Sequence, residues 1–258
     1  MAIITLTTDF GLADGYVGIM KGVILRIAPE ARLVDLSHEV PAQDIRRASA
    51  VLARAIPYFP DGTVHLAVVD PGVGGSRRAL IVAALGSFFV GPDNGLFSEP
   101  LADTNARIYA ADRPEFWLPA PSHTFHGRDI FAPLAAHLAL GRQPEELGTP
   151  AGAPVRLPPA PAPRRLPDGS LGGQVVHVDR FGNLITDVPG AWLAGRGWSC
   201  RIAGQSIDRL SISYSEAERG ALLALVSSAG TLEIAVREGS AAASLGVGTG
   251  EPVLLLPA

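Results

Sequence analysis

Acidic side chains directly follow short apolar runs in the N-terminal part of the chain, where they could do chemistry. Asp9 follows the run at residues 3–6 within TTDFG, and Asp14 comes five residues later. Asp70 follows the run at residues 63–69 and opens DPGVGG. A carboxylate in such a place can accept hydrogen bonds from sugar hydroxyls, bind a cation or act as a general base. The competing roles are structural, because Asp also caps helices and closes turns.

Two arginines and a histidine could complement these acids. Arg77 and Arg78 follow the Gly-rich turn, which could fold back toward Asp70. That turn lacks the Lys-Ser/Thr of a P-loop and the spacing of a dinucleotide fingerprint, so it is a weak phosphate motif. His126, within SHTFHGRD, could act as a general base or orient a ligand, although a single His is more often structural.

A further group of candidate residues lies near the C-terminal end. Phe181 and Asn183 interrupt a strand-like pattern within VDRFGN. An aromatic face could stack on a purine ring and an amide could pair with its edge, whereas Gly and Asn are equally typical of a β-turn. The loop at residues 237–241, REGSA, is rich in small residues, so its backbone amides could approach a ligand closely.

Composition restricts the class of protein. The chain has 258 residues, of which 47% are hydrophobic, so it can bury a sizeable core. The net charge of −4 and the absence of a basic cluster argue against binding of nucleic acid. No apolar run reaches membrane-spanning length, and no signal peptide is recognisable at the start of the sequence. We therefore expect a cytoplasmic protein that binds neither nucleic acid nor membrane.

Cysteine and histidine usage restricts the metal chemistry. The single cysteine, Cys200, excludes a disulfide framework and a thiolate metal cluster. The six histidines show no His-x-His or HExxH spacing, so a zinc site is not expected. A hard-cation site built from Asp9, Asp70 and Asp93 is conceivable and would suit a metal-dependent phosphohydrolase. We nevertheless expect no metal and no separate cofactor.

The elements that must position these residues alternate between strands and helices. Apolar patterns predict strands at 3–6, 33–36, 63–69, 80–84 and 88–90, and helices at 16–26, 45–55 and 130–140. Three of the strands end in polar, Gly-rich turns, namely TTDFG, DPGVGG and GPDNG. Such a pattern predicts an α/β layer fold, in which ligands bind at the carboxyl ends of the strands.

The composition changes after this part. We expect an N-terminal α/β domain at residues 1–150, a Pro-rich linker at 151–170 and a smaller all-β domain at 171–258. Strand-like runs in the last segment lie at 172–178, 200–207, 221–226, 232–236 and 253–256.

Six motifs now stand in a fixed order along the chain. They are TTDFG with Asp14, VVDPGVGG with Arg77, GPDNG, TFHGRD, VDRFGN and the late REGSAA loop. Together they resemble the S-adenosyl-L-methionine (SAM) hydroxide adenosyltransferase family, which is related to the SAM-dependent fluorinase and chlorinase. Each motif alone is weak, but the ordered set covers nearly the whole chain.

The resemblance implies a fluorinase/chlorinase-like two-domain fold and a reaction. Enzymes of this family attack the ribose C5′ of SAM, and the branch that uses water releases adenosine and L-methionine. The resemblance places Asp70, Arg77 and His126 near the nucleophile, with Arg78 as the alternative arginine. It also implies a homotrimer with sites between the N-terminal domain of one subunit and the C-terminal domain of the next.

The substrate-binding residues follow from the same resemblance. Asp9 matches the acid that holds the ribose hydroxyls, and Asp14 matches a nearby acid of the pocket. Asp179 and Ser228 match positions at the methionine end. The matches on the adenine side are Phe181, Asn183 and the loop with Glu238 and Ser240, and Asn94 of GPDNG is a further expected contact.

Departures from the halogenases favour water as the nucleophile. The halogenases carry an extra loop before the strand that leads to PDNG, and residues 80–90 contain no such insertion. The fluorinase has uncharged residues where this chain has Asp70 and His126. VDRFGN is also one residue shorter than the fluorinase version, and Arg237 with Glu238 replaces a more neutral pair. The alternatives are a chlorinase-like halogenase, the phosphohydrolase named above and a non-catalytic protein that binds SAM or adenosine.

Overall fold

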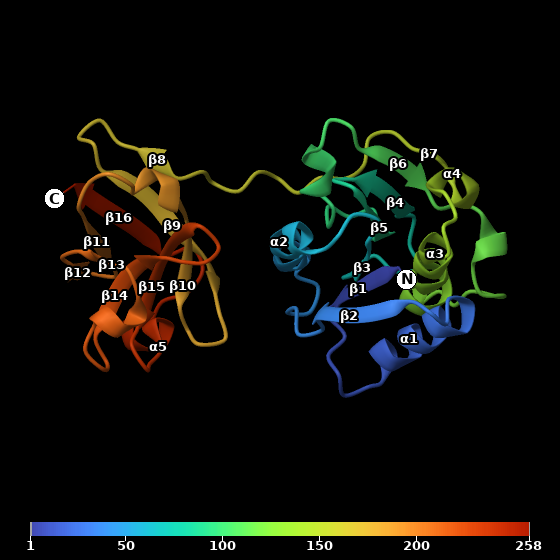
Figure 1. The fold of residues 1–258 in the computed structure, drawn as a ribbon, viewed down its shortest axis with the longest axis horizontal. Helices are drawn as coiled ribbons and strands as arrows, with labels where there is room; N and C mark the ends of the chain where they lie inside the picture. The colour runs from blue at the N-terminus through green and yellow to red at the C-terminus, as the bar shows by residue number, and fades with distance from the viewer. Residues whose placement is uncertain (1, 258) are drawn as a thin grey trace. The chain divides into compact units, whose positions relative to one another are not determined.

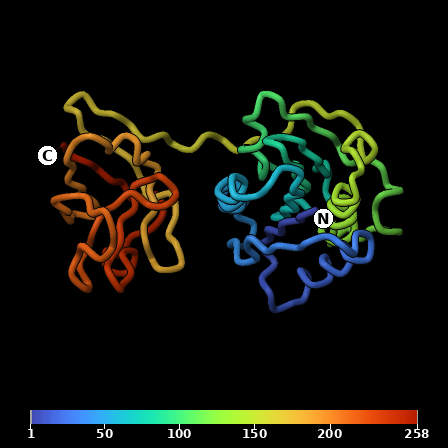
Figure 2. The backbone as a smooth tube through the Cα atoms, viewed as in Figure 1, coloured from blue at the N-terminus to red at the C-terminus, as the bar shows by residue number. Residues whose placement is uncertain are grey.

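The computed structural model describes residues 2–257, which form two compact units divided between Pro158 and Pro159 (Figures 1 and 2). The start of the Pro-rich segment packs on the N-terminal unit, because Arg78 donates hydrogen bonds to the carbonyl oxygens of Gly152 and Ala153. The N-terminal unit therefore includes the first part of that segment.

Seven strands form the sheet of the N-terminal unit, in the order β2-β1-β3-β5-β4-β6-β7. They are β1 (Ile3–Thr8), β2 (Arg32–Ser37), β3 (Val64–Val68), β4 (Ala79–Ala84), β5 (Ser87–Pro92), β6 (Arg107–Ala110) and β7 (Thr149–Pro150). Strands β1, β2, β3 and β5 are parallel, whereas β4 pairs antiparallel with β5 and β6. The structure confirms the five strands predicted here and adds β6 and β7.

Helices cover both faces of this sheet (Figure 1). Helices α1 (Tyr16–Ile27) and α3 (Ala132–Ala139) share one buried cluster with Ile4 and Leu6 of β1. Helix α2 (Ile45–Ala55) packs on the other face, where Leu52 lies with Phe89 of β5. The short helix α4 (Pro144–Leu147) follows α3. Burial of apolar side chains on both faces is what holds a mixed α/β sheet in a fixed geometry.

The third predicted helix begins earlier than expected. Residues Gly127–Phe131 form a π-helical turn that leads directly into α3, whereas the sequence pattern predicted a start at residue 130. Glycine is a poor helix former, so propensity argues against including Gly127. Packing favours glycine there, because an added Cβ would lie 3.2 Å from the sulfur of Met20 and would force that side chain to shift.

The C-terminal unit is β-rich, as predicted. Its sheet has the order β12-β11-β16-β9-β10-β15-β14-β13, and β8 pairs with β9. The strands are β8 (Arg164–Arg165), β9 (Leu171–Val178), β10 (Leu184–Pro189), β11 (Trp198–Ile202), β12 (Gln205–Ile207), β13 (Leu210–Ser211), β14 (Leu222–Val226), β15 (Thr231–Val236) and β16 (Pro252–Pro257). The ends of the sheet approach each other, since β11 contacts β13 and β12 contacts β14, so the sheet forms a nearly closed barrel. The short helix α5 (Ala241–Leu245) packs on β15.

One predicted strand of this unit is wrong. Residues 200–207 are not a single strand but the hairpin of β11 and β12. Its turn places both Ala203 (φ 49°) and Gly204 (φ 74°) in the left-handed region. A two-residue hairpin turn favours positive φ at both central positions, and alanine gives no sequence signal for it.

Candidate active site

The candidate residues of the N-terminal unit meet at one edge of its sheet. Asp9 follows the end of β1, and Asp70 lies two residues beyond the end of β3. Because β4 is antiparallel to β5, with Ala79 opposite Pro92, the chain enters β4 at this same edge. Arg77 therefore reaches the carboxyl ends of the parallel strands, where an open α/β sheet binds ligands.

Asp70, Arg77 and His126 form a single contact cluster. The Arg77 Nε atom donates to both carboxylate oxygens of Asp70 at 3.0 Å, and one terminal nitrogen makes a close second contact to Asp70 Oδ2. That terminal nitrogen also lies 2.7 Å from His126 Nδ1. The side chains of Asp70 and Arg77 are only 5% and 11% exposed, so their charges interact in a poorly solvated place.

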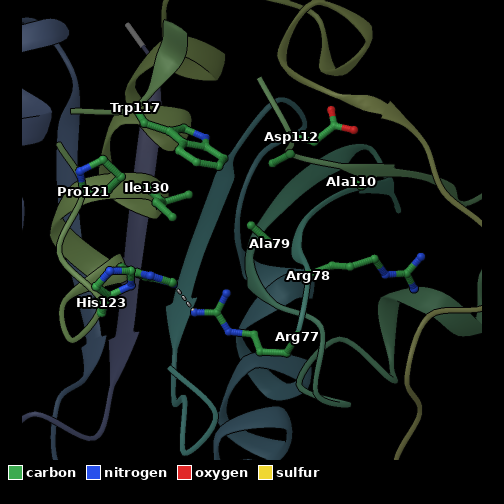
Figure 3. A pocket seen from close by; sticks show the side chains of 11 residues that line it. Arg77, Arg78, Ala79, Ala110, Asp112, Trp117, Pro121, His123 and Ile130 are labelled. Carbon is green, nitrogen blue, oxygen red and sulfur yellow. Dashed lines mark hydrogen bonds between the residues drawn. The ribbon is translucent and has the colours of Figure 1, made fainter. Parts of the chain in front are cut away.

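The structure distinguishes Arg77 from Arg78. The two side chains extend in opposite directions, and Arg77 points toward the loop that carries His123 (Figure 3). Arg78 instead pairs with Asp93 at 2.6 Å. The alternation of side chains along an extended backbone separates neighbouring arginines in this way.

The hydrogen bond with Arg77 determines the tautomer of His126. A guanidinium has only donors, so the contact with Arg77 makes His126 Nδ1 an acceptor. The neutral ring then carries its proton on Nε2. Burial, followed by the charge of Arg77, lowers the pKa of His126 below the ordinary value of 6.5, while Asp70 opposes that shift. The neutral ring is therefore the stable form at neutral pH.

A cavity of about 320 Å³ joins Asp9 to this cluster, since Asp9, Asp70 and His126 all line it. Asp9 is half-buried, and its Oδ2 atom accepts a hydrogen bond of 2.8 Å from the Gln43 amide. Gln43 has φ 65°, a conformation that is uncommon outside glycine and asparagine. Such strain is typical of functional loops, and no residue type in the sequence signalled it.

Aromatic rings form part of the same cavity wall, although no motif or spacing in the sequence marked them as site residues. Phe10 and Phe125 line the cavity and meet edge-to-face, with ring centroids 6.0 Å apart. Tyr16 packs against both rings. The predicted contact Asp14 is exposed in the segment between Asp9 and α1 and does not line this cavity.

A second cavity of about 340 Å³ lies beside the first and is mostly apolar (Figure 3). His126 lines both cavities, whereas Arg77 lines only the second and Asp70 only the first. The cluster of these three side chains therefore separates the two cavities. The indole nitrogen of Trp117, which also lines the second cavity, is buried without a hydrogen-bond partner among residues 2–257.

The side-chain amide of Asn94 bonds the backbone of two neighbouring segments. Its Nδ2 atom donates to the Val69 carbonyl oxygen at 2.8 Å, and its Oδ1 atom accepts from the Leu96 amide at 3.2 Å. These bonds tie the turn after β5 to the end of β3. Asn94 does not line either cavity, although it lies at the same sheet edge.

In the C-terminal unit, the VDRFGN motif forms a closed turn between β9 and β10. Asp179 accepts hydrogen bonds from the amides of Phe181 and Asn183, both at 2.9 Å, and from the Asn183 side chain at 3.0 Å. The turn presents Phe181 outward, and this residue is 76% exposed. The carboxylate and the amide thus shape the turn, while the ring is free to contact a ligand or another chain.

The late loop lies against this turn. Ser240 caps α5 by accepting from the Ala243 amide, and an added Cβ on Gly182 would lie 2.0 Å from the Ser240 hydroxyl. Glu238 has φ 57° and pairs with Arg219 at 3.1 Å. Ser228 is not brought to this end of the unit.

Strand register explains the position of Ser228. Strands β14 and β15 form a hairpin whose turn contains Ser228, next to the pair Val226 and Leu232. The loop with Glu238 lies at the other end, next to the pair Leu222 and Val236. Within the C-terminal unit, Ser228 and the Asp179 turn therefore lie at opposite ends of the sheet.

Residues 2–257 contain neither a helix that could span a membrane nor a cluster of metal ligands. No helix in this range is both long enough and apolar enough to cross a bilayer. No three or more His, Cys, Asp or Glu side chains gather in this range in a way that could hold a metal ion. The aspartates at the sheet edge are instead paired with arginine or with backbone amides.

Two protein-family models match this chain. Residues 4–148 match the model of the SAM hydroxide adenosyltransferase N-terminal domain, and residues 173–254 match that of the C-terminal domain. The chain belongs to the SAM hydroxide adenosyltransferase family. The resemblance seen in the ordered motifs is thereby confirmed.

Relatives of this family member cover nearly its whole length. It is 47% identical to the (R)-S-adenosyl-L-methionine hydrolase of Thermus thermophilus, over 96% of this chain and 97% of that protein. A fluorinase of Nocardia brasiliensis is 26% identical, over 90% of this chain and 89% of the other. The crystal structure of an uncharacterized conserved protein from Thermotoga maritima superposes with a TM-score of 0.89 at 36% identity, covering 98% of this chain and all of that one. The two-domain fold predicted from the sequence is confirmed.

Proposed function

We propose that this protein hydrolyses (R)-S-adenosyl-L-methionine to adenosine and L-methionine by attack of water on the ribose C5′. The observation that carries the proposal is the near full-length identity of 47% to a SAM hydrolase. The site supports it chemically, because Asp9 and the Asp70–Arg77–His126 cluster share one cavity. The substrate is a cation, and attack by an oxygen nucleophile releases a neutral thioether.

The bond changes balance without a cofactor. The water oxygen forms a bond to C5′, the C5′–S bond breaks, and its electron pair stays on sulfur. One proton leaves the water. The Asp9 carboxylate can accept a hydrogen bond from each of the two ribose hydroxyls. These two bonds would orient the ribose so that C5′ faces the Asp70–Arg77–His126 cluster. A poorly solvated site strengthens each of these electrostatic contacts.

The tautomer of His126 indicates which group takes the proton. His126 Nδ1 is occupied by Arg77, and Nε2 already bears a proton, so the neutral ring donates and does not accept. Asp70 keeps free lone pairs on its carboxylate and is the general base of the proposal. His126 then orients the water through Nε2–H, and Arg77 holds both partners in place.

Hydrolysis in isotopically labelled water tests the proposal. SAM incubated with the protein in H₂¹⁸O should yield adenosine with ¹⁸O in its 5′-hydroxyl, measured by mass spectrometry. The same reaction with added chloride or fluoride should give no 5′-halo-5′-deoxyadenosine, and a chelator should not change the rate. Intact SAM after long incubation would overturn the function, and a halogenated product would assign the protein to the halogenase branch.

The surroundings of His126 predict its pKa, which can be measured without an activity assay. Its ring should titrate below pH 6.5, because burial and Arg77 both disfavour the imidazolium. Arg77→Met should move this titration upward, as one of the two causes is removed. NMR of the imidazole protons measures both values, with His137 as the control. The pKa of His137 is also lowered by burial, but its cationic neighbour is Arg142, so it should not respond to Arg77→Met.

We also propose that the protein works as a homotrimer in which the exposed Phe181 turn of one subunit faces the N-terminal cavity of another. The family resemblance and the 76% exposure of Phe181 support this arrangement. Analytical ultracentrifugation should give a mass three times that of the 26.9 kDa chain, and a monomer would contradict it. The cytoplasmic location expected from the sequence stays a prediction.

A further inference from the structure

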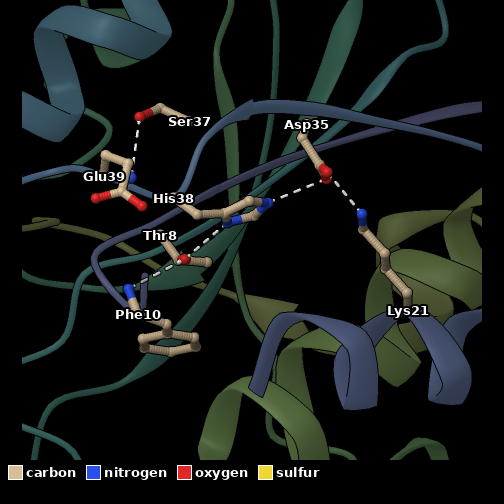
Figure 4. A network of polar contacts seen from close by, with 7 residues as sticks. All are labelled: Thr8, Phe10, Lys21, Asp35, Ser37, His38 and Glu39. Atoms are coloured by element: carbon tan, nitrogen blue, oxygen red, sulfur yellow. Dashed lines mark hydrogen bonds and ion pairs between the residues drawn. The ribbon is translucent and has the colours of Figure 1, made fainter. Parts of the chain in front are cut away.

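Thr8 and Phe10, the neighbours of Asp9, are linked to a buried histidine that follows the neighbouring strand β2 (Figure 4). His38, just after β2, is 4% exposed, and its Nδ1 atom lies 2.9 Å from the Thr8 hydroxyl. Its carbonyl oxygen accepts a hydrogen bond of 2.8 Å from the Gly11 amide. His38 therefore holds the backbone on both sides of Asp9.

The ring of His38 contacts a carboxylate on one side and a hydroxyl on the other. The Nε2 atom lies 3.0 Å from Asp35 Oδ1, at an angle outside regular hydrogen-bond geometry, and the negative charge beside it favours a proton on Nε2. Nδ1 is then an acceptor and the Thr8 hydroxyl its donor. The Thr8 oxygen in turn accepts from the Phe10 amide at 3.3 Å.

The far end of this chain of contacts is anchored on a helix. Asp35 also accepts from Lys21 of α1 at 2.6 Å, and the contacts together hold the pKa of Asp35 below its ordinary value although burial opposes this. The anchor is partly exposed, at 30% for Lys21 and 39% for Asp35, so its own contribution to stability is small. Its structural effect is to fix the ring orientation of His38.

A second threonine–histidine pair on the same strand supplies a comparison. The Thr5 hydroxyl lies 2.8 Å from Nδ1 of His65, and both residues are fully buried. The Nε2 atoms of both His38 and His65 lack a hydrogen-bond partner of regular geometry among the described residues, but only His38 has a carboxylate beside its Nε2 atom. Burial lowers the pKa of His65 to about 4. The Thr5–His65 pair lies within the sheet, with Thr5 three residues before Thr8 along β1, and lines neither cavity.

We propose that His38 is a positioning residue for substrate binding, which fixes the backbone of residues 8–11 so that the Asp9 carboxylate faces the ribose hydroxyls. The inference rests on the proposed function, because it assumes that the cavity holds the nucleoside of SAM. An acidic ligand contact on a turn needs its backbone held by surrounding groups, much as outer residues orient the ligands of a metal. The Lys21–Asp35–His38–Thr8 chain provides that support from outside the cavity.

Matched substitutions on one strand test the inference. Thr8→Val and Thr5→Val each remove one buried hydroxyl that bonds a histidine, while keeping the side-chain shape. Thr8→Val should weaken adenosine binding roughly three- to tenfold, measured by calorimetry, and raise KM for SAM by the same factor with little change in kcat. Thr5→Val should leave both values within about twofold. His38→Leu should act in the same direction as Thr8→Val and more strongly.

The outcomes separate the inference from the proposed function. Denaturant midpoints should fall similarly in the two Val variants, so a difference confined to adenosine and SAM cannot come from stability alone. Equal adenosine affinity in Thr8→Val and Thr5→Val, with both folded, would overturn the positioning role. If His38→Leu and Thr8→Val lower kcat and leave KM unchanged, the role assigned to Asp9 is wrong. Failure of the unmodified protein to bind adenosine or hydrolyse SAM would instead refute the proposed function.

Discussion

Asp70→Asn should lower kcat for SAM hydrolysis roughly 10²- to 10⁴-fold, the usual contribution of a positioned general base. The reason is that asparagine cannot accept the proton that the attacking water must lose. The side chain is 5% exposed and receives three contacts from Arg77, so solvent offers no substitute in the same geometry. KM should change little, because Asp70 acts on the water and not on the nucleoside. Single-turnover release of adenosine measures the effect directly.

Asp93→Asn is the matched control for this prediction. Asp93 is another buried carboxylate at the same sheet edge, its side chain is 4% exposed, and it pairs with Arg78 as Asp70 pairs with Arg77. It lines neither cavity. The control should lose stability and keep kcat within about threefold. A normal kcat in Asp70→Asn would exclude Asp70 as the base.

Asp9→Ala should raise KM for SAM about 10²-fold and leave kcat within a few-fold of the unmodified protein. Two ribose hydroxyls lose a charged acceptor, and each hydrogen bond to a charged group contributes about 1.5–3 kcal/mol. Part of that energy is offset because water enters the half-buried site. Steady-state kinetics over a wide SAM range separate the two constants.

A substrate analogue provides the control for Asp9. A SAM analogue without the 2′- and 3′-hydroxyls should bind the unmodified protein and Asp9→Ala with similar affinity, because the interaction is absent in both. If Asp9→Ala weakens this analogue as much as it weakens SAM, the carboxylate acts on something other than the ribose. A loss confined to kcat would show that Asp9 takes part in the chemical step.

Local pattern was sufficient to predict most of the N-terminal fold. Alternation and helical spacing identified five strands and α2 with its exact bounds, because those segments bury one regular face. Errors arose where packing overrides propensity. Gly127 extends a helix where an added Cβ would lie tightly against Met20, and Ala203 takes positive φ in a tight hairpin.

The roles of the predicted site residues depended more on distant contacts. Asp179 and Asn183 are hydrogen-bonded to each other within one turn, so part of their hydrogen-bonding capacity stabilises that turn and is not available to a ligand. The register of β14 and β15 places Ser228 at the end of the hairpin opposite the Glu238 loop, and a sequence motif does not encode that register. Gln43 and His38 both hold the Asp9 turn, yet each lies about thirty residues away from it in sequence.

By itself, the sequence determined the residue types, the order of the motifs and the turns at the strand ends. These depend on local backbone preference and on the period of apolar side chains. Only the tertiary structure decided that Arg77 rather than Arg78 meets Asp70, and that His126 presents Nε2–H. The antiparallel entry of β4 brings both arginines to this edge, and their opposite side-chain directions (Figure 3) leave only Arg77 facing Asp70. Arg77 then dictates the tautomer of His126. Such choices follow from contacts between segments up to 49 residues apart, which local preference does not specify.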